Sequence, residues 1–496
     1  MNFLGGKFRM KRIISIILLL VLLLIACSCS NTQTVAETTA AAETTTAETE
    51  EELKSNLPND LDLNGMELII FHTSDDMFAE ESLELSGDVV NDAIFKRNST
   101  VMEQLNVSLV YMENDDYDCA PEVRASVLAG SDDFQIVSGS QWIVAPLVLE
   151  NTLMNLAVGS YLDLEQPWWA VAYNREAAIG DDVRFFITGD ITLCALKRMS
   201  CMYFNKSFYE NIYGDPNDMY GIVLDGDWTL DKFGELGSGC YSDLNGDGVK
   251  NKDDQYGYGV ITANLTDHFT YDAGIRASTR DSSGIPELTI NNEKTINFTE
   301  KLYDIYYNND GVYVFEPTGD SVDKVMPAKF AAGEMLYNPG WFYTADRLRD
   351  MESDYGVIPF PKYDEKEEKY LSLMHDTTLV YCCPITIGNK FEPSCAVMEA
   401  LAFEGYRLTL PAYYDVALKI KYVRDSDDDA LKIVDMIHDG ATTDFVYIYN
   451  YTLNGIGLIM RQLMGSKSAD FASKYAQLSG SALKLFDELI ELYTTL

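Results

Sequence analysis

The chain has 496 residues, and 78 acidic against 37 basic side chains give it a formal net charge of −41 at pH 7. This surplus of negative charge excludes nucleic acids and anionic lipid surfaces as partners. With 47% hydrophobic and 12% aromatic residues, the chain has enough apolar side chains for two domains or two lobes.

The amino end has the pattern of a bacterial export signal. Lys11 and Arg12 precede an almost unbroken apolar run, 13–25, which is short for a membrane span but suits the core of a signal peptide. The run ends in Leu24–Cys27, which resembles a lipobox, so we expect Cys27 to carry the lipid and to become the first mature residue. The alternatives are an uncleaved anchor helix, or Cys29 as the acceptor.

Residues 28–60 follow as a polar segment rich in Thr, Ala and Glu, with few large apolar side chains. A segment of this composition cannot bury enough apolar surface to offset the entropy lost on ordering, so we expect a disordered tether. The predicted organisation is therefore a signal peptide over 1–27, a tether over 28–60, and a globular remainder.

Strands and helices alternate at the start of the globular part. Strand patterns at 66–71, 107–112 and 134–137 are separated by helix patterns at 92–105 and 121–129. Such alternation predicts an open parallel sheet, and ligands of such sheets gather at the carboxyl ends of the strands. Trp142 follows the third strand there, so it is a candidate ligand contact, with packing against the sheet as the alternative.

A twelve-residue acidic loop, 243–254, follows a helix that begins near Trp228. Oxygen-bearing side chains stand at positions one, three, five, nine and twelve, with glycine at six, which is the spacing by which a short loop wraps a hard cation. The predicted Ca²⁺ ligands are Asp243, Asn245, Asp247, the Val249 carbonyl, Asn251 and Asp254. Aspartate at position twelve, where glutamate is common, shortens the reach and leaves room for water. The alternative is a solvated Asx-rich turn.

The nine cysteines show no spacing typical of a disulfide framework or of a cysteine-rich metal site. Cys194 and Cys201 are close enough in sequence to pair, but the pattern favours buried thiols. Ca²⁺, in a structural role, is therefore the one cofactor that the sequence predicts.

Several short segments, in a fixed order, carry a family resemblance. After the lipobox and the tether come YFNK at 203–206, GDWTLDKF at 226–233, the acidic loop with QYGYG, FAAGE to Gly-Trp at 330–341, and DYGVIPFPK at 354–362. Together they resemble the extracellular solute-binding proteins of bacterial ABC importers, of the carbohydrate type (family 1-like) found as lipoproteins in Gram-positive bacteria. The resemblance runs from Cys27 to about Ile437.

The resemblance implies a type II periplasmic-binding-protein-like α/β fold with two lobes joined by hinge crossovers. Lobe 1 would comprise 61–190 and 357–403, and lobe 2 would comprise 191–356 and 404–496, with the terminal helices on lobe 2. It also implies a monomer without enzymatic activity, lipid-anchored on the outer face of the cell membrane, that binds a carbohydrate and delivers it to ABC permease subunits.

A sugar site needs flat aromatic side chains for the C–H faces of the ring and polar groups for its hydroxyls. Trp341 and Tyr343 follow a glycine turn where, by the resemblance, the cleft aromatic of the family lies, and packing in the core is the alternative for Trp341. Neighbours on an extended chain point in opposite directions, so one member of the Trp168–Trp169 pair is expected to pack inside. The predicted ligand contacts are Trp142, Trp168, Trp169, Asp190, Trp341, Tyr343 and Asp376.

Two other classes of protein share parts of this pattern. A surface-anchored glycoside hydrolase would need two carboxylates facing one bond, and the many acidic residues make such a pair impossible to single out. None of the common serine-hydrolase, metalloprotease or nucleotide-binding motifs occurs, and the four histidines stand alone. A carbohydrate-adhesion module would mostly be all-β, which the alternation of strands and helices disfavours.

Overall fold

The first sheet of the computed structural model contains four strands in the order β12–β3–β1–β2. Their bounds are β1 Met66–Thr73, β2 Val107–Asn114, β3 Ile136–Ser140 and β12 Leu379–Cys382. β1 pairs in parallel with β2 and β3, whereas β12 runs antiparallel to β3. The first three strands confirm the strands expected from the sequence, and the carboxyl end of β3 leads directly to Trp142.

Three helices accompany this sheet: α2 Val89–Leu105, α3 Ala120–Ala129 and α14 Phe391–Glu404. Asp88 caps the start of α2, and its carboxylate accepts hydrogen bonds from the backbone N–H groups of Val90 and Asn91, the second and third residues of the helix. It ends at Asn106, which takes a left-handed conformation and leads straight into β2. α2 and α14 pack on each other beside the sheet.

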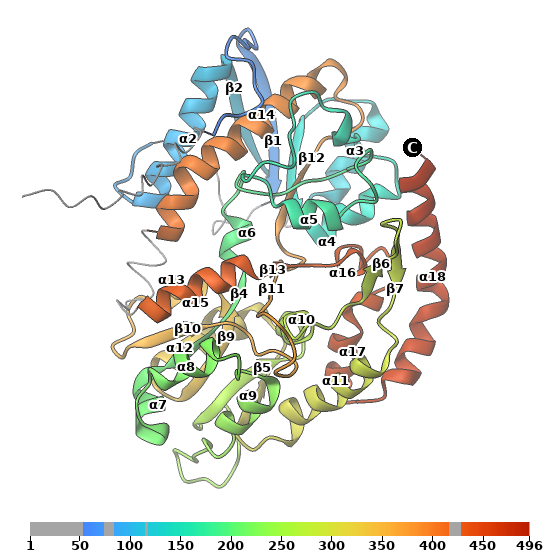
Figure 1. The fold of residues 1–496 in the computed structure, drawn as a ribbon. Coiled ribbons are helices and arrows are strands. Elements are labelled where there is room, and N and C mark those ends of the chain that lie inside the picture. Colours follow the sequence, from blue (N-terminus) through green and yellow to red (C-terminus); the bar gives the residue numbers. More distant parts are fainter. Residues whose placement is uncertain (1–52, 74–83, 115–117, 416–427, 496) are drawn as a thin grey trace, which may run out of the picture. The chain divides into compact units, whose positions relative to one another are not determined.

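The second sheet has five strands in the order β10–β4–β9–β5–β8. Their bounds are β4 Ser200–Asn205, β5 Tyr256–Ile261, β8 Val312–Phe315, β9 Met335–Trp341 and β10 Tyr355–Ile358. β5 pairs in parallel with β8 and β9, and β4 runs antiparallel to β9. Both sheets therefore repeat one arrangement, in which three parallel strands are extended by an antiparallel strand from another part of the chain. Figure 1 draws the first sheet above the second.

The chain crosses between the sheets more than once. It leaves the first sheet after β3 and enters the second at β4, and it returns to the first sheet at β12. The expected lobe boundary at Val357 lies inside β10, which pairs with β4 of the second sheet, so the return begins only after Ile358. Pro359 and Pro361 follow at once, and proline cannot continue a ladder of backbone hydrogen bonds.

The remaining helices lie around the crossovers and the second sheet. Those up to β5 are α4 Gln141–Val144, α5 Val171–Glu176, α6 Cys194–Lys197, α7 Lys206–Tyr213, α8 Asp218–Leu224 and α9 Leu230–Gly237. Those after β5 are α10 Asn264–Tyr271, α11 Glu293–Tyr303, α12 Met326–Ala331, α13 Thr344–Arg347, α15 Asp428–Asp439, α16 Phe445–Ile448, α17 Ile459–Gly465 and α18 Phe471–Thr495. Two further sheets have two short strands each. One pairs β6 Ser278–Arg280 with β7 Pro286–Leu288, and the other pairs β11 Ser372–Leu373 with β13 Ala441–Thr442.

The terminal helix α18 reaches both lobes. It packs on α17 and α11, and at its other end Tyr493 lies edge-on to Phe185, 5.4 Å between ring centroids. The segment that contains Phe185 is joined to the first sheet by the bridge between Ile187 and Tyr381. The terminal helix, expected on the second lobe alone, therefore connects the two because its apolar stripe continues to its last turn.

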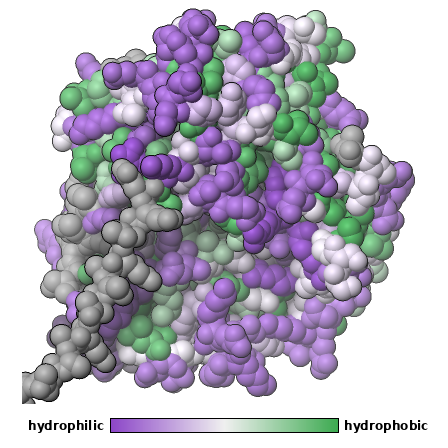
Figure 2. All heavy atoms as spheres, turned by 45° about the horizontal axis from the view of Figure 1, so that its top comes forward, coloured by the Kyte–Doolittle hydropathy of each residue, from purple (hydrophilic) through white to green (hydrophobic). Residues whose placement is uncertain are grey.

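The structure describes residues 53–73, 84–114, 118–415 and 428–495, and the predicted signal peptide, Cys27 and most of the predicted tether lie outside them. Residues Ser55–Leu496 form one compact unit. Within the described ranges all seven cysteines are buried free thiols, Cys194 and Cys201 included. No helix in these ranges combines the length and apolar character of a membrane span. The face drawn in Figure 2 is mostly hydrophilic, with hydrophobic side chains scattered over it.

Candidate ligand-binding site at the crossovers

A cavity of about 270 Å³ lies where the crossover segments meet. Its wall comes from Pro167, from 169–173 and from residues between 189 and 199 of the first crossover, from Met374 of the return, and from Tyr406, Leu410, His438, Ala441 and Thr442. The volume is close to the lower end of the range for small-molecule sites, about 300–1,000 Å³. Two residues predicted from the sequence as ligand contacts, Trp169 and Asp190, lie in this wall.

Trp169 and Asp190 come together because two extended segments pair there. Trp169 and Gly189 form an antiparallel bridge, and the backbone N–H of Asp190 donates to the carbonyl of Trp168 at 2.8 Å. A side chain at Gly189 would not fit, since its Cβ would lie 2.5 Å from that carbonyl oxygen. Glycine at this position therefore sets the spacing between the aromatic and the acidic part of the cavity wall.

The two neighbouring indoles have different surroundings but share one acceptor. Trp168 packs edge-on against Phe403 in the core beside α14, and it does not line the cavity. Both indole N–H groups donate to the carboxylate of Glu399, at 3.1 Å from Trp168 and 3.0 Å from Trp169. Glu399 thus fixes the edge of the Trp169 ring at the cavity.

The carboxyl group of Asp190 is half-buried in the same wall. Burial raises its pKa to about 8, because the charged form loses its hydration there. At neutral pH the group is therefore mostly protonated, and it can both donate and accept a hydrogen bond. The cavity wall is largely apolar, its polar groups besides Asp190 include the side chains of Tyr406, His438 and Thr442, and its lining among the described residues contains no lysine or arginine.

A second group of predicted residues lies at the ends of β9 and β3. Trp341, the last residue of β9, is only 1% exposed and stacks on Tyr343, with centroids 5.4 Å apart and planes 8° apart. The indole N–H of Trp341 is buried without a hydrogen-bond partner in the described part of the chain. Trp142, at the start of α4, is half-buried and lies 5.3 Å from the ring of the exposed Tyr451.

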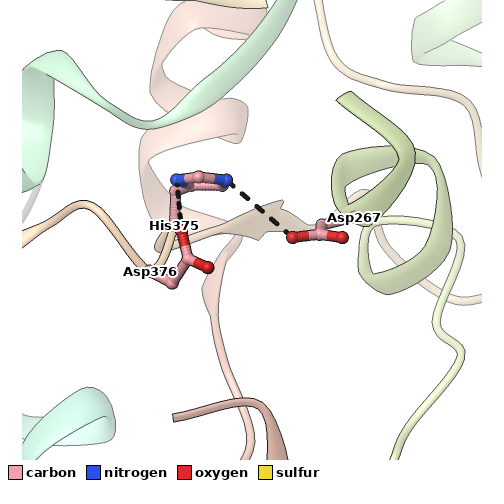
Figure 3. Close-up of side chains that lie close together, drawn as sticks. All are labelled: Asp267, His375 and Asp376. Carbon is pink, nitrogen blue, oxygen red and sulfur yellow. Dashed lines mark ion pairs between the residues drawn. The ribbon is translucent and has the colours of Figure 1, made fainter. Parts of the chain in front are cut away.

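Asp376, also predicted, belongs to a buried polar cluster that we define as Asp267, His375, Asp376, Tyr447 and Arg461. Arg461 Nε donates to Asp267 Oδ1 at 2.7 Å, and its Nη2 contacts Oδ2 of Asp267 and, at 3.2 Å, Oδ2 of Asp376. His375 lies between the two carboxylates, 3.0 Å from Asp376 and 3.8 Å from Asp267 (Figure 3). The Tyr447 hydroxyl donates to Asp267 at 3.1 Å.

Burial governs the charges of this polar cluster. It raises the pKa of Asp267 to about 7 against the opposing effect of Arg461, and it lowers the pKa of His375 well below its ordinary value. His375 is therefore neutral, and its Nε2 faces an Arg461 Nη2 donor at 3.3 Å. Donor atoms of Asp267, His375 and Asp376 lie within 4.8 Å of one another, but Arg461 already supplies the cation between the carboxylates.

The cavity and the polar cluster are adjacent. Met374 lines the cavity, and the next residue is His375. Tyr173 also lines it and donates its hydroxyl to Gln141 at 2.6 Å, beside Trp142. Of the seven predicted ligand contacts, Trp169 and Asp190 line the cavity and Asp376 belongs to the polar cluster. Trp142 donates its backbone N–H to the Asp376 carbonyl at 3.0 Å, and the ring of Trp341 lies 6.1 Å from that of His375. Tyr343 stacks on Trp341, and Trp168 lies in the core. The six predicted Ca²⁺ ligands lie elsewhere, between α9 and β5.

Sequence reasoning missed Arg461, Asp267, His375 and Glu399, which come from distant parts of the chain. The one usable signal was Arg461 itself, a charge inside the apolar stripe Ile459, Met460, Leu463 and Met464 of α17. A charged residue on a buried helix face requires a partner of opposite charge. The sequence alone does not indicate which of the many acidic residues that partner is.

No protein-family model and no curated protein matches this chain. Solved structures do, over most of its length. The maltose/maltodextrin-binding domain MalE from Bdellovibrio bacteriovorus, bound to maltotriose, matches with a TM-score of 0.54 and 14% identity over 86% of this chain and 100% of that one. An ABC substrate-binding protein from Listeria monocytogenes, in complex with cycloalternan, matches with a TM-score of 0.53 and 12% identity over 86% of this chain and 99% of that one.

UgpB from Mycobacterium tuberculosis, in complex with glycerophosphocholine, matches with a TM-score of 0.55 and 13% identity over 85% of this chain and 99% of that one. At such identities the likeness establishes the fold. The chain has the two-lobed α/β fold of periplasmic binding proteins, as predicted from the sequence. The solved structures that resemble it include substrate-binding proteins of ABC transporters with sugars bound.

Proposed function

We propose that this protein is the substrate-binding component of an ABC importer, that it captures a carbohydrate between its lobes, and that it delivers it to a permease. The observation that carries the proposal is the cavity at the crossovers, whose wall includes both Trp169 and Asp190. In binding proteins of this fold the lobes close around the ligand, and the closed form is what a permease would recognise.

The chemistry of the cavity favours a neutral, hydroxyl-bearing ligand. An indole face suits the C–H surface of a sugar ring, and a carboxyl group that both donates and accepts suits a hydroxyl. A phosphate-bearing ligand, such as the one in UgpB, would need a cationic side chain, and no lysine or arginine occurs in the described lining. The net charge of −41 also disfavours anionic ligands.

Further aromatic groups next to the cavity support an oligosaccharide. Trp142 and the exposed Tyr451 form an aromatic pair beside the polar cluster, and the buried indole N–H of Trp341 has no acceptor among the residues that the structure describes. Each could contact a sugar unit beyond the one in the cavity once the lobes separate. A ligand with several rings would therefore use both halves of the site.

A surface-anchored glycoside hydrolase is the alternative, and the geometry does not favour it. Hydrolysis needs one carboxylic acid and one free carboxylate on opposite sides of a bond. Asp267 and Asp376 are both buried and both bonded to Arg461, so neither is available for that work. We therefore propose binding without catalysis.

The proposal includes a lipid anchor at Cys27, for which the support is the apolar run 13–25 and the lipobox-like Leu24–Cys27. The polar segment 28–60 would then hold the two lobes near the outer face of the membrane. The predicted sites of anchoring and of ligand binding are thus on separate parts of the chain.

The experiment is a thermal-shift screen of the purified protein against oligosaccharides, glycerophosphodiesters, amino acids and short peptides, followed by titration calorimetry. A ligand that binds only the folded state raises the melting temperature. We expect an oligosaccharide to raise it, with one site per chain and no release of reducing ends on long incubation. Stabilisation by peptides or by phosphodiesters alone would contradict the substrate class, and hydrolysis of the sugar would contradict the proposed role.

A further inference from the structure

The loop 243–254 is closed by a pair of backbone hydrogen bonds at its base. Ser242 and Gln255 form an antiparallel bridge, with N–H to carbonyl distances of 3.1 and 3.0 Å. Residues opposite each other across such a pair lie on one face. Asp243 and Asp254, the first and last residues of the loop, stand next to this bridge, so their side chains start on the same side of it.

Inside the loop, side-chain oxygens accept hydrogen bonds from backbone N–H groups. The carboxylate of Asp243 accepts from Gly246 and Gly248 at 2.7 and 2.8 Å, and that of Asp247 accepts from Val249 at 2.7 Å. Gly246 and Gly248 take left-handed conformations, with φ of 72° and 71°, which glycine adopts without strain. This pattern explains the shape of the loop, but a solvated turn would share it.

Asp254 distinguishes the two interpretations. Its side chain is fully buried, and its Oδ2 accepts from the Asn251 N–H at 3.0 Å and from the Tyr241 hydroxyl at 3.3 Å. Its Oδ1 has no hydrogen-bond partner in the described part of the chain. A buried carboxylate oxygen without a partner destabilises the fold, because it has lost its hydration without gaining a hydrogen bond. In a solvated turn without a bound ion, this oxygen would be expected to face water.

The neighbouring cationic side chains do not neutralise the loop. Lys250 donates to the carbonyl of Asp310 at 2.7 Å, and Lys252 pairs with Asp253, which is not at a ligand position. Across the described ranges, no lysine or arginine forms an ion pair with the carboxylates at positions one, five and twelve. The loop therefore holds three carboxyl groups without a cationic partner in the described ranges, and one of them has an orphaned oxygen.

The oxygen ligands of the loop favour Ca²⁺ over smaller or softer cations. The three carboxylates of the loop are not among the groups of the described residues whose donor atoms lie within 4.8 Å of one another, so the loop oxygens would have to draw together around an ion. Ca²⁺ binds oxygen at about 2.3–2.6 Å, so oxygens on opposite sides of the ion are about 5 Å apart. Mg²⁺ requires a tighter octahedron, and the all-oxygen set disfavours Zn²⁺.

We propose that the loop 243–254 binds one Ca²⁺ ion. The side chains of Asp243, Asn245, Asp247 and Asp254 and the carbonyl of Val249 supply the oxygens, and water completes the shell, one molecule of it held by Asn251. The ion is structural. It joins the end of α9 to β5, the strand in the second sheet that pairs with both β8 and β9.

The test is calorimetric titration of Ca²⁺ into the full chain after chelator treatment, with Mg²⁺ titrated in parallel. We expect one saturable site and at least about tenfold weaker binding of Mg²⁺. Asp254→Asn should weaken Ca²⁺ binding at least about tenfold, because a carboxylate ligand becomes a neutral amide. The matched control is Asp253→Asn, which makes the same charge change one residue away and should shift the affinity less than about threefold.

Circular dichroism is used to check that each variant is folded. If Asp254→Asn does not fold, Asp247→Asn, at an exposed position, takes its place. The melting temperature of the parent should rise with Ca²⁺, and that of the Asp254 variant should not. The absence of saturable Ca²⁺ binding to the parent would overturn the proposal. An equal loss in the Asp253 and Asp254 variants would also overturn it, since the effect would then reflect only general charge.

Discussion

Arg461 on α17 and Asp267 on α10 form a two-pronged ion pair across 194 residues of sequence, with Nε to Oδ1 at 2.7 Å. The same guanidinium also contacts Asp376, on the segment that returns to the first sheet. One arginine thus connects two helices of the second lobe to a crossover. Removing it leaves two buried carboxylates without a counter-charge.

We therefore expect Arg461→Met to lower the free energy of unfolding by about 3–5 kcal/mol at neutral pH. The control is Arg124→Met, which removes an ion pair to Glu150 whose two side chains are 45% and 37% exposed, and which should cost about 0–1 kcal/mol. The loss of stability caused by Arg461→Met, relative to the parent, should become smaller as the pH falls toward 5, because Asp267 becomes protonated. Denaturant unfolding measures both, and equal losses in the two variants would contradict the role of the buried pair.

The titration of Glu399 should make the stability of the protein depend on pH. Burial raises its pKa from 4.5 to about 7, while the indole N–H groups of Trp168 and Trp169 lower it. Because the folded pKa lies above the unfolded one, its contribution to stability is present below about pH 4.5 and is lost as the pH rises through about 7. The loss is on the order of 3 kcal/mol.

Glu399→Gln should therefore be less stable than the parent at about pH 5, because its amide N–H₂ is a donor that faces the N–H donor of one indole. The difference in the free energy of unfolding between the two proteins should become smaller by about pH 8. Glu488→Gln, at an exposed position of α18, should show no such change. The measurement is the free energy of unfolding of each protein at several pH values. A difference independent of pH would mean that Glu399 does not titrate in this window.

Filling the cavity should prevent ligand binding. Ala195 on α6 lines it, so Ala195→Leu places three further carbon atoms in the space of the ligand. We expect the affinity for the oligosaccharide found in the screen to fall at least about tenfold, which is about 1.4 kcal/mol. The control, Ala472→Leu on an exposed face of α18, should leave it unchanged. Unaltered affinity in the folded Ala195 variant would move the site to the region around Trp341.

Two glycine substitutions should have opposite effects on stability. Gly189→Ala should cost about 1–3 kcal/mol, because its Cβ would lie 2.5 Å from the Trp168 carbonyl and 2.7 Å from the Trp169 Cα. Gly480→Ala, at an exposed and open position inside α18, should gain about 0.5–1 kcal/mol. Thermal and denaturant unfolding measure both. A neutral Gly189 variant would show that the two paired segments can move apart freely.

The lipid anchor is tested by substituting each of the two amino-terminal cysteines. Cys27→Ala should release the protein from the membrane fraction of a bacterial host and abolish labelling with a fatty-acid analogue. Cys29→Ala should leave both unchanged, since Leu24–Cys27 fits the lipobox pattern at Cys27. Release by the Cys29 substitution instead would identify that residue as the acceptor, and retention of both variants would favour an uncleaved anchor helix.

The sequence by itself determined the local elements and the class of fold. The strands β1 to β3 and the helices between them follow from periodicity, because a strand or a helix repeats its buried face over a few residues. The ligand spacing of the loop 243–254 is also visible in the sequence, since all its expected ligands lie within twelve positions, and the Ca²⁺ site stays a prediction. The order of short motifs then indicated the two-lobed fold, which the solved structures confirm.

Only the tertiary structure decided which of the predicted contacts lie together. Trp168 and Trp169 are identical in type and adjacent, yet only Trp169 lines the cavity, because a turn and a glutamate on α14 orient both rings. The partners of Arg461 and the raised pKa of Asp190 likewise depend on burial and on residues distant in sequence. Periodicity encodes the direction of a side chain within its own element, but not the neighbours that packing brings to it.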